Sequence, residues 1–347
     1  MLKKFISKIM QGQNLTHREA ETAMQFIMTG QATPAQIGGY LVALRMKGET
    51  VEEITGSAKA MRAQAHAIRP LVNGDPLLDT AGTGGDGAHT FNISTAAAFV
   101  VAGTGHRVAK HGNRAASSRC GSADVLAALG LNLDLAPKQV AACIDEVGIG
   151  FLFAPLFHPA MKFAIGPRRE LGQRTIFNVL GPLTNPAGAT NQLIGVYDLD
   201  LTHTLAEVLG ELGGKAAFVV HGYGGLDELT TNGPNRVSHL RDGRVSTYDL
   251  DGRDFGLRSA PPDTLAGGEP DENARMLLAL LSGRDSSPRK DVVLFNAAAA
   301  LATETGDFEA AIAQAKNSLE SGAALKKLNA LVDYSQEIAQ PQVGYAH

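Results

Sequence analysis

The chain has 347 residues, enough for one large domain or for a large domain joined to a small one. Its formal net charge of −4 argues against sequence-independent nucleic-acid binding, and the lack of Trp argues against a base-stacking platform. No apolar run could span a bilayer, and Ser7, Lys8 and Gln11 interrupt the start of the chain before any signal-peptide core. Cys120 and Cys143 are too few for a disulfide scaffold. We therefore expect a cytoplasmic protein without membrane or nucleic-acid partners.

Residues 1–70 are expected to form a helical domain. Capping boxes mark the starts of its helices: Thr16 with Glu19, Thr33 with Gln36, and Thr50 with Glu53. Apolar residues follow at helical spacing. The simplest interpretation is a packing layer without chemistry. Its outer face can also cover a second subunit, for which we expect positions such as Ile37, Leu41 and Leu44.

From Leu77 onward, short strands alternate with helices. The expected strands are Leu77–Thr80, Arg107–Lys110, Ile149–Phe153, Leu193–Tyr197 and Ala216–Val220. The helices between them include Ser122–Leu129, Pro137–Val147 and Leu201–Leu212. This alternation predicts an α/β domain over 71–340, with a mainly parallel sheet flanked by helices. Ligands of such sheets bind at the carboxyl ends of the strands.

The last third of the chain departs from this alternation. Asn235–Tyr248 is expected to form an antiparallel hairpin that turns at Asp242-Gly243. Asp254–Glu269 is rich in Gly, Pro and Asp and is expected to be a loop. Two helices, within Glu272–Leu281 and Phe308–Ser321, should close the domain, and 341–347 should be a frayed tail.

A glycine-rich segment follows the first expected strand. Gly82, Gly84 and Gly87 match the dinucleotide pattern G-x-G-x-x-G, but the helix does not start directly after the third glycine. An acidic residue about twenty positions further on, which would hold a ribose, is also missing. Four glycines with Asp86 and a hydroxyl-rich helix start favour a phosphate cradle over a plain turn.

A polar segment, Lys110–Ser118, follows the second expected strand, and a further helix starts at Gly121-Ser122. Lys, His, Asn, Arg and Ser side chains would be costly to bury without partners, although a solvated loop is the alternative. Asn113 can both donate to and accept from a polar substrate group. Two phosphate-binding turns this close together indicate a ligand with more than one phosphate group.

Two charged pairs complete the candidate site residues. Asp227-Glu228 follows a strand and a glycine-rich turn, and we expect it on a solvent-facing loop. It is either solvated charge or, beside a polyphosphate, a Mg²⁺ site, and both alternatives stay open. Arg168-Arg169 could bind a carboxylate bidentately, whereas an ion pair of Arg169 with Glu170 is the structural alternative.

These motifs together resemble the anthranilate phosphoribosyltransferase family of tryptophan biosynthesis. The matching stretches are Asp79–Asp86, Asn92–Thr95, Lys110–Ser118, Gly121–Gly130, His158–Met161, Arg168–Asn185 and Val220–Glu228. The departures at Ala115-Ala116 and Arg119-Cys120 are small. The resemblance implies that the amine of anthranilate attacks the anomeric carbon of phosphoribosyl pyrophosphate and displaces pyrophosphate. No covalent nucleophile is needed, so no catalytic residue of that kind is expected.

The resemblance also implies residue roles. Phosphoribosyl pyrophosphate would contact Gly82, Gly85, Asp86, Thr90, Asn92, Ile93, Ser94, Thr95, Lys110, His111, Gly112, Asn113, Arg114, Ala115, Ala116, Ser117, Ser118 and Ser122. Anthranilate would contact Gly82, His111, Asn113 and Arg168, with Arg168 facing its carboxylate. Ser94, Asp227 and Glu228 would bind Mg²⁺, with two ions per subunit.

The implied fold is a small helical domain, joined by helices around 165–185, hinged to the α/β domain. A homodimer through the helical domain is implied as well. Two other classes of protein are alternatives. A pyrimidine nucleoside phosphorylase shares the architecture but needs a Lys-His-Ser-Thr type of phosphate loop where this chain has Asp79–Thr83. A non-catalytic nucleic-acid-binding relative predicts a basic surface and eroded metal ligands, whereas this chain is acidic and retains Asp227 and Glu228.

Overall fold

The computed structural model describes residues 1–115 and 118–339. Our predictions for Ala116, Ser117 and the tail at 341–347 lie outside the described residues. Within the described part, no helix is long and apolar enough to cross a membrane.

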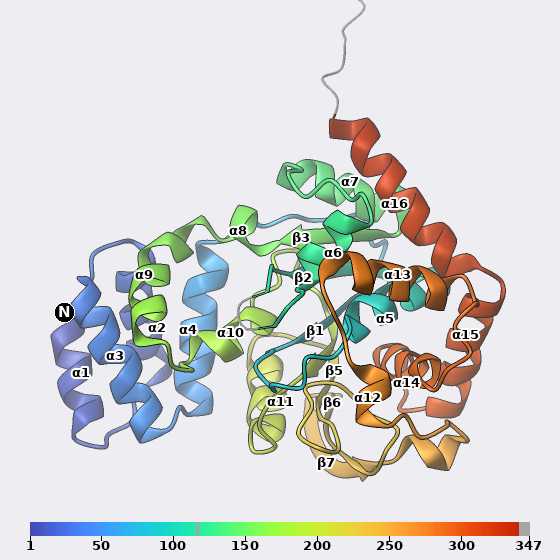
Figure 1. The fold of residues 1–347 in the computed structure, drawn as a ribbon. Helices are drawn as coiled ribbons and strands as arrows, with labels where there is room; N and C mark the ends of the chain where they lie inside the picture. Colours follow the sequence, from blue (N-terminus) through green and yellow to red (C-terminus); the bar gives the residue numbers. More distant parts are fainter. Residues whose placement is uncertain (116–117, 340–347) are drawn as a thin grey trace, which may run out of the picture.

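A helical bundle forms the N-terminal part of the molecule (Figure 1). It contains α1 (Leu2–Met10), α2 (His17–Met28), α3 (Pro34–Lys47) and α4 (Val51–Ala63). The three predicted capping boxes are present, because the hydroxyls of Thr16, Thr33 and Thr50 each accept a hydrogen bond from the third helical N–H. One expectation was wrong. Ile37, Leu41 and Leu44 are at most 1% exposed and pack inside the bundle of their own chain, so they are not free to cover a partner.

Within the described residues, the strands form one seven-stranded sheet in the order β3-β2-β1-β4-β5-β6-β7. The parallel strands are β1 (Leu77–Gly82), β2 (Arg107–Gly112), β3 (Ile149–Phe153), β4 (Asn191–Gly195) and β5 (Ala216–His221). The hairpin of β6 (Asn235–Arg241) and β7 (Arg244–Leu250) adds antiparallel to β5. The predicted α/β class is confirmed.

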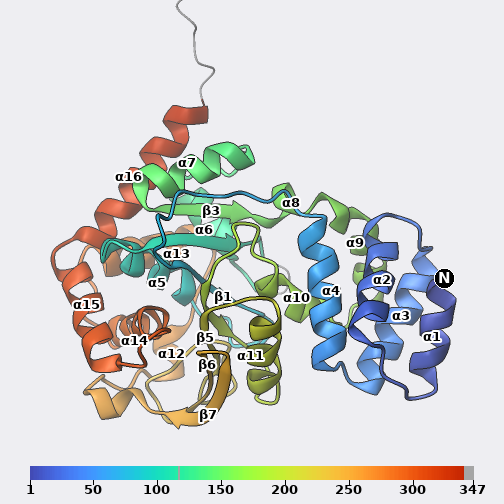
Figure 2. The ribbon, with the colours of Figure 1, turned by 180° about the vertical axis from the view of Figure 1, so that it is seen from behind.

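Helices cover both faces of the sheet (Figures 1 and 2). On one face, the core contains α5 (Ile93–Gly103), α13 (Pro270–Leu281), α14 (Arg289–Leu301), α15 (Phe308–Glu320) and α16 (Ala323–Ala339). Helices α6 (Ser122–Ala128) and α7 (Pro137–Val147) join this core near β2 and β3. Helix α11 (Leu201–Glu211) covers the other face, in a core that continues into the bundle.

Successive residues of a strand point alternately into the two cores. Leu193 and Phe218 face the first core, and their neighbours Ile194 and Val219 face the second. Both faces are therefore apolar, which explains why the strands appear in the sequence as short continuous hydrophobic runs.

The C-terminal third differs most from expectation. Helices α14 and α16 were not predicted as separate elements. Asp291–Ala300 is buried along its whole length, so α14 lacks the one-sided apolar stripe that marks a surface helix. The expected loop Asp254–Glu269 contains the short helix α12 (Pro262–Leu265) and the end of a 3₁₀ turn, Gly252–Phe255.

The chain returns to the bundle in the middle of the α/β domain. After β3, α8 (Ala154–Phe157) and a 3₁₀ turn, Pro159–Met161, lead to α9 (Lys162–Leu171), which packs on α2 and α3. Helix α10 (Phe177–Leu183) then lies beside α4. Arg62 of α4 donates to the carbonyl oxygens of Leu183 and Leu212 at 2.8 and 3.2 Å, so hydrogen bonds cross the junction.

Candidate active site

Two loops and the start of a helix converge at the carboxyl ends of the parallel strands. The glycine-rich loop follows β1, the loop carrying Asp227 and Glu228 follows β5, and the start of α5 lies between them. Gly84 N donates to Asp227 Oδ2 at 2.6 Å, and Ser94 N donates to Glu228 Oε1 at 3.0 Å. Residues that lie more than 130 positions apart thus share one site, as expected for a parallel sheet.

The conformation of the glycine-rich loop requires glycine. Gly84 and Gly85 have φ values of +63° and +80°, and a Cβ at Gly82 would lie 2.5 Å from Asp227 Oδ2. Successive residues of this kind direct backbone N–H groups toward a common centre, which suits an anion. Asp86 closes the loop, because its carboxylate accepts hydrogen bonds from Ala88 N and Asp227 N.

Asp227 and Glu228 are half-buried, and the expectation of a solvent-facing loop was wrong. Burial, and then the neighbouring charge of Asp86, raises the pKa of Asp227 to about 7. Burial, and then the charge of Asp227, raises the pKa of Glu228 to about 8, while Lys110 opposes this shift. Crowded carboxylates at a strand end form a site that a divalent cation would stabilise.

The start of α5 supplies a row of polar groups. Asn92 is the N-cap residue, although its side chain makes no capping bond, and Ile93 is buried. Thr95 is also buried, and its hydroxyl has no hydrogen-bond partner among the described residues. Just before the helix, Thr90 forms a β-bridge with Ala266.

Lys110 and Asp79 form the buried floor of the site. Lys110 Nζ donates to Thr80 O at 2.6 Å and lies 3.4 Å from Ser94 Oγ. Asp79 accepts from His111 N at 3.1 Å and from Asn185 Nδ2 at 2.7 Å, and burial raises its pKa to about 6. We assigned no role to Asp79 or Asn185 from the sequence. The signal was a carboxylate inside an apolar strand, which needs a buried partner.

His111 lies against His158, with their ring centroids 5.1 Å apart. Burial lowers the pKa of His111 to about 3 and that of His158 to about 4, so both imidazoles are neutral at pH 7. The Nε2 atoms of both rings are buried and have no partner among the described residues. His158 had been noted only as part of a motif.

The loop after β2 is more open. Gly112 and Ala115 are half-buried, whereas Asn113, Arg114 and Ser118 are exposed. Arg114 forms a 2.8 Å ion pair with Asp124 of α6, so its charge is partly neutralised. Ser122 Oγ donates to Asn113 O at 3.3 Å, which ties this loop to the start of α6.

Arg168 lies across the junction from these loops, on α9. It is half-buried, and its guanidinium carbon lies 5.1 Å from the centre of the Phe177 ring. Among the described residues, Arg169 forms no ion pair with Glu170, so the structural alternative for this arginine pair is not observed. Arg174, between α9 and α10, donates to the carbonyl oxygen of Gly85 and stacks on Tyr197.

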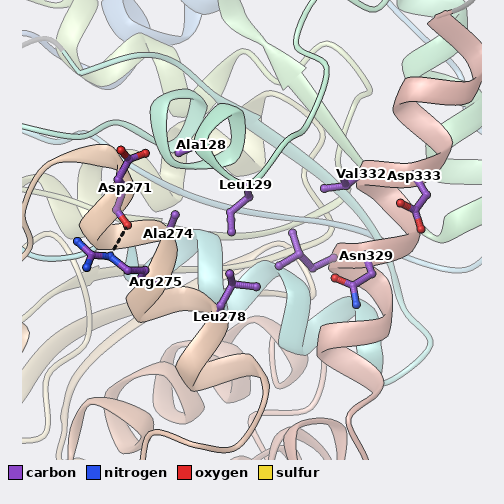
Figure 3. A pocket seen from close by; sticks show the side chains of 10 residues that line it. Ala128, Leu129, Asp271, Ala274, Arg275, Leu278, Asn329, Val332 and Asp333 are labelled. Atoms are coloured by element: carbon purple, nitrogen blue, oxygen red, sulfur yellow. Dashed lines mark hydrogen bonds between the residues drawn. The ribbon is translucent and has the colours of Figure 1, made fainter.

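A hollow of about 520 Å³ lies elsewhere, between α6, α13 and α16 (Figure 3). Its walls are Ala128, Leu129, Asp271, Ala274, Arg275, Leu278, Leu328, Asn329, Val332 and Asp333. None of the candidate site residues lines it. The loops at the strand ends are the better candidate for chemistry, because the glycine-rich loop, Lys110 and the Asp227-Glu228 pair meet there.

The fold and these loops define a glycosyl transferase with two domains. The helical bundle domain of the glycosyl transferase family matches residues 3–65, and the a/b domain of that family matches residues 74–325. The anthranilate phosphoribosyltransferase of Moorella thermoacetica is 56% identical over 342 residues, which cover 98% of this chain and 100% of that protein. The chain belongs to the anthranilate phosphoribosyltransferase family.

Solved structures agree with this assignment. The anthranilate phosphoribosyltransferase of Thermus thermophilus superposes with a TM-score of 0.90 at 44% identity, covering 95% of this chain and 99% of that one. The yeast enzyme in complex with PRPP (phosphoribosyl pyrophosphate) and Mg superposes with a TM-score of 0.89 at 30% identity. The same enzyme in complex with 4-fluoroanthranilate superposes with a TM-score of 0.87, also at 30% identity. Each yeast match covers 97% of this chain and 98% of the other.

Proposed function

We propose that this chain transfers the phosphoribosyl group of phosphoribosyl pyrophosphate to the amine of anthranilate, forming N-(5-phosphoribosyl)anthranilate and pyrophosphate in tryptophan biosynthesis. The observation that carries the proposal is the meeting of the glycine-rich loop, the start of α5 and the Asp227-Glu228 loop at one sheet edge. Both free cysteines are buried, which suits a reducing cytoplasm.

The phosphoribosyl donor would occupy the loops after β1 and β2. The backbone N–H of Gly85 and the start of α5 would hold the pyrophosphate, with Lys110 as the buried cation beneath. The transition state has oxocarbenium character, so the leaving pyrophosphate needs stabilisation more than the acceptor needs activation. Preorganised backbone donors supply this without rearrangement during the reaction.

The donor set of Ser94, Asp227 and Glu228 fits Mg²⁺. Oxygen ligands are what this ion prefers, and it usually takes one or two carboxylates together with substrate oxygens and water. Substrate oxygens and water would supply the remaining ligands. Bound Mg²⁺ would supply Lewis-acid stabilisation of pyrophosphate. We assign two ions per subunit.

Anthranilate would lie between the loop after β2 and α9. Arg168 would pair with the anthranilate carboxylate, and Asn113 and Gly82 would line the opposite wall. His111 is neutral at pH 7, so it can accept a hydrogen bond from the aromatic amine without repelling the cationic transition state by a full charge. Positioning of the weakly basic amine is the main contribution of this half of the site.

We assign α9 to the helical domain, because α9 packs on α2 and α3, and we place a homodimer interface there. The apolar side chains left exposed on α3 and α9 are Val42, Met46, Phe163 and Ile165, between 37 and 83% exposed. A second copy of the chain would cover this patch. Light scattering of Met46→Glu should show a monomer where the parent shows a dimer. A monomeric parent at micromolar concentration would contradict the interface.

Calorimetry separates this function from the phosphorylase alternative. Phosphoribosyl pyrophosphate should bind in the presence of Mg²⁺ and lose affinity when the metal is chelated. A pyrimidine nucleoside with inorganic phosphate should not bind. Binding of the nucleoside and not of the pyrophosphate would overturn the proposed function.

A further inference from the structure

Asn273 of α13 lies behind the start of α5 and is 1% exposed. Its Nδ2 donates to Asn92 Oδ1 at 2.9 Å, and its Oδ1 accepts from Gly268 N at 2.8 Å. Because Gly268 N is a donor, the oxygen of the Asn273 amide must face it. The amino group of the same amide therefore faces Asn92. None of the roles given above includes it.

The amide of Asn92 has one favoured orientation in this setting. Its Oδ1 receives the Asn273 amino group and lies 3.5 Å from Cys120 Sγ, while its Nδ2 donates to Cys120 O at 3.2 Å. Burial raises the pKa of the Cys120 thiol to about 11, so the thiol keeps its proton and can donate to Oδ1 at neutral pH. Turning the Asn92 amide over would place donor against donor and carbonyl against carbonyl.

This orientation leaves one N–H of the Asn92 amide without a protein partner among the described residues. Asn92 makes no side-chain capping bond to α5, so its acceptor Oδ1 is not used to start the helix and stays with Asn273 and Cys120. The neighbouring backbone is held as well, because Phe91 N donates to Leu265 O at 2.9 Å and Gly267 N donates to His89 O at 2.8 Å. Segment 265–273 therefore supports residues 89–92 through both main chain and side chain.

We propose that Asn273 is a positioning residue that orients the Asn92 amide with its amino group toward phosphoribosyl pyrophosphate, an inference that rests on the proposed function. An amide in the other orientation would present its oxygen to an anion and repel it. Asn273 acts only through Asn92 and does not touch the substrate. Asn273 does not line the hollow, although Asp271 and Ala274 of the same helix do (Figure 3).

A double-mutant cycle tests this role. Asn273→Leu removes the donor at nearly constant size, and Asn92→Ala removes the group on which it acts. With Asn92 present, Asn273→Leu should raise the KM for phosphoribosyl pyrophosphate about tenfold, as expected for loss of one hydrogen bond to a charged group. The KM for anthranilate should change less than twofold. In the Asn92→Ala background, Asn273→Leu should change the KM for the pyrophosphate substrate less than twofold.

The controls distinguish positioning from stability. Asn329→Leu, an exposed asparagine on α16, should leave both KM values unchanged. Should Asn273→Leu not fold, Asn273→Ser takes its place in the same cycle. If the substitution at Asn273 changed the KM for phosphoribosyl pyrophosphate by the same factor with and without Asn92, Asn273 would only support the fold. That result would overturn this inference and leave the proposed function standing. A parent protein without turnover would overturn the proposed function and this inference with it.

Discussion

Gly84 N donates a hydrogen bond to Asp227 Oδ2 at a distance of 2.6 Å, although the two residues lie 143 positions apart in the sequence. This contact joins the candidate phosphate loop to the candidate metal ligands. Because Asp227 N also donates to Asp86 Oδ2 at 3.3 Å, the two loops hold each other at both ends. A change in either loop should therefore affect phosphate and metal binding together.

Replacing Asp227 with Asn and Glu228 with Gln tests the metal assignment. Each amide retains an oxygen that can accept the hydrogen bond from Gly84 N or Ser94 N, so the fold should persist. Loss of two metal ligands should lower kcat at least tenfold and raise the Mg²⁺ concentration needed for half-maximal rate. Rates are to be measured across a Mg²⁺ titration. A titration curve identical to the parent's would show that these carboxylates do not bind the metal.

Arg168→Ala tests the acceptor site. The guanidinium should contact only anthranilate, so its loss should raise the KM for anthranilate tenfold or more and leave that for phosphoribosyl pyrophosphate nearly unchanged. Arg169→Ala is the matched control, since this exposed neighbour removes the same charge from the same helix. Equal changes in both Michaelis constants for Arg168→Ala would make this arginine structural.

Gly85→Ala tests the glycine-rich loop. The new residue must adopt a φ near +80°, and its Cβ would lie 3.4 Å from Arg174 Nε. We expect a loss of about 1 kcal/mol in the free energy of unfolding and a weaker affinity for phosphoribosyl pyrophosphate in calorimetry. Gly243→Ala, at φ +71° in the β6–β7 turn with open space around it, controls for backbone strain alone. Parent-like affinity in Gly85→Ala would reduce the loop to a plain turn.

His158 gives the stability a predictable pH dependence. Its folded pKa of about 4 lies below the ordinary value of 6.5, so the unfolded chain binds more protons between these values. Stability is therefore lost as pH falls from 6.5 toward 4. Glutamine does not titrate in this range. Between pH 7 and pH 5, the free energy of unfolding of His158→Gln should therefore fall by about 2 kcal/mol less than that of the parent. Urea unfolding at both pH values measures the free energy of unfolding of the two proteins. An equal loss in parent and variant would mean that the His158 ring is exposed to solvent.

Local signals in the sequence predicted the parts of this fold that depend on neighbouring residues. Hydroxyl caps such as Thr16 and Thr33 start helices through bonds three residues away, so the pattern is visible in sequence. Strand β4 was placed two residues too late, because the apolar run continues beyond Gly195 into Val196-Tyr197 while the ladder starts at the polar Asn191. Asn191 and Gln192 are buried by tertiary contacts that a propensity argument does not contain.

In the site, too, local sequence patterns identified some residues, whereas those that depend on distant partners were missed. Glycines, paired charges and strand ends identified Gly84, Lys110 and Asp227 as candidates from composition and spacing alone. The supporting residues Asp79, Asn185 and Asn273 could not be found in this way, because each acts on a partner that is more than thirty positions distant. Burial of Asp227 and Glu228 was missed for the same reason, since it depends on contacts with Gly84 and Ser94, which lie more than 130 positions away.

Pyrophosphate release with and without anthranilate tests the central claim most directly. The purified chain, supplied with phosphoribosyl pyrophosphate and Mg²⁺, should release pyrophosphate only when anthranilate is added, in equal amount to the N-(5-phosphoribosyl)anthranilate formed. Omission of Mg²⁺ should abolish this release. Release that is independent of anthranilate, or its absence when all three components are present, would contradict the proposed transfer.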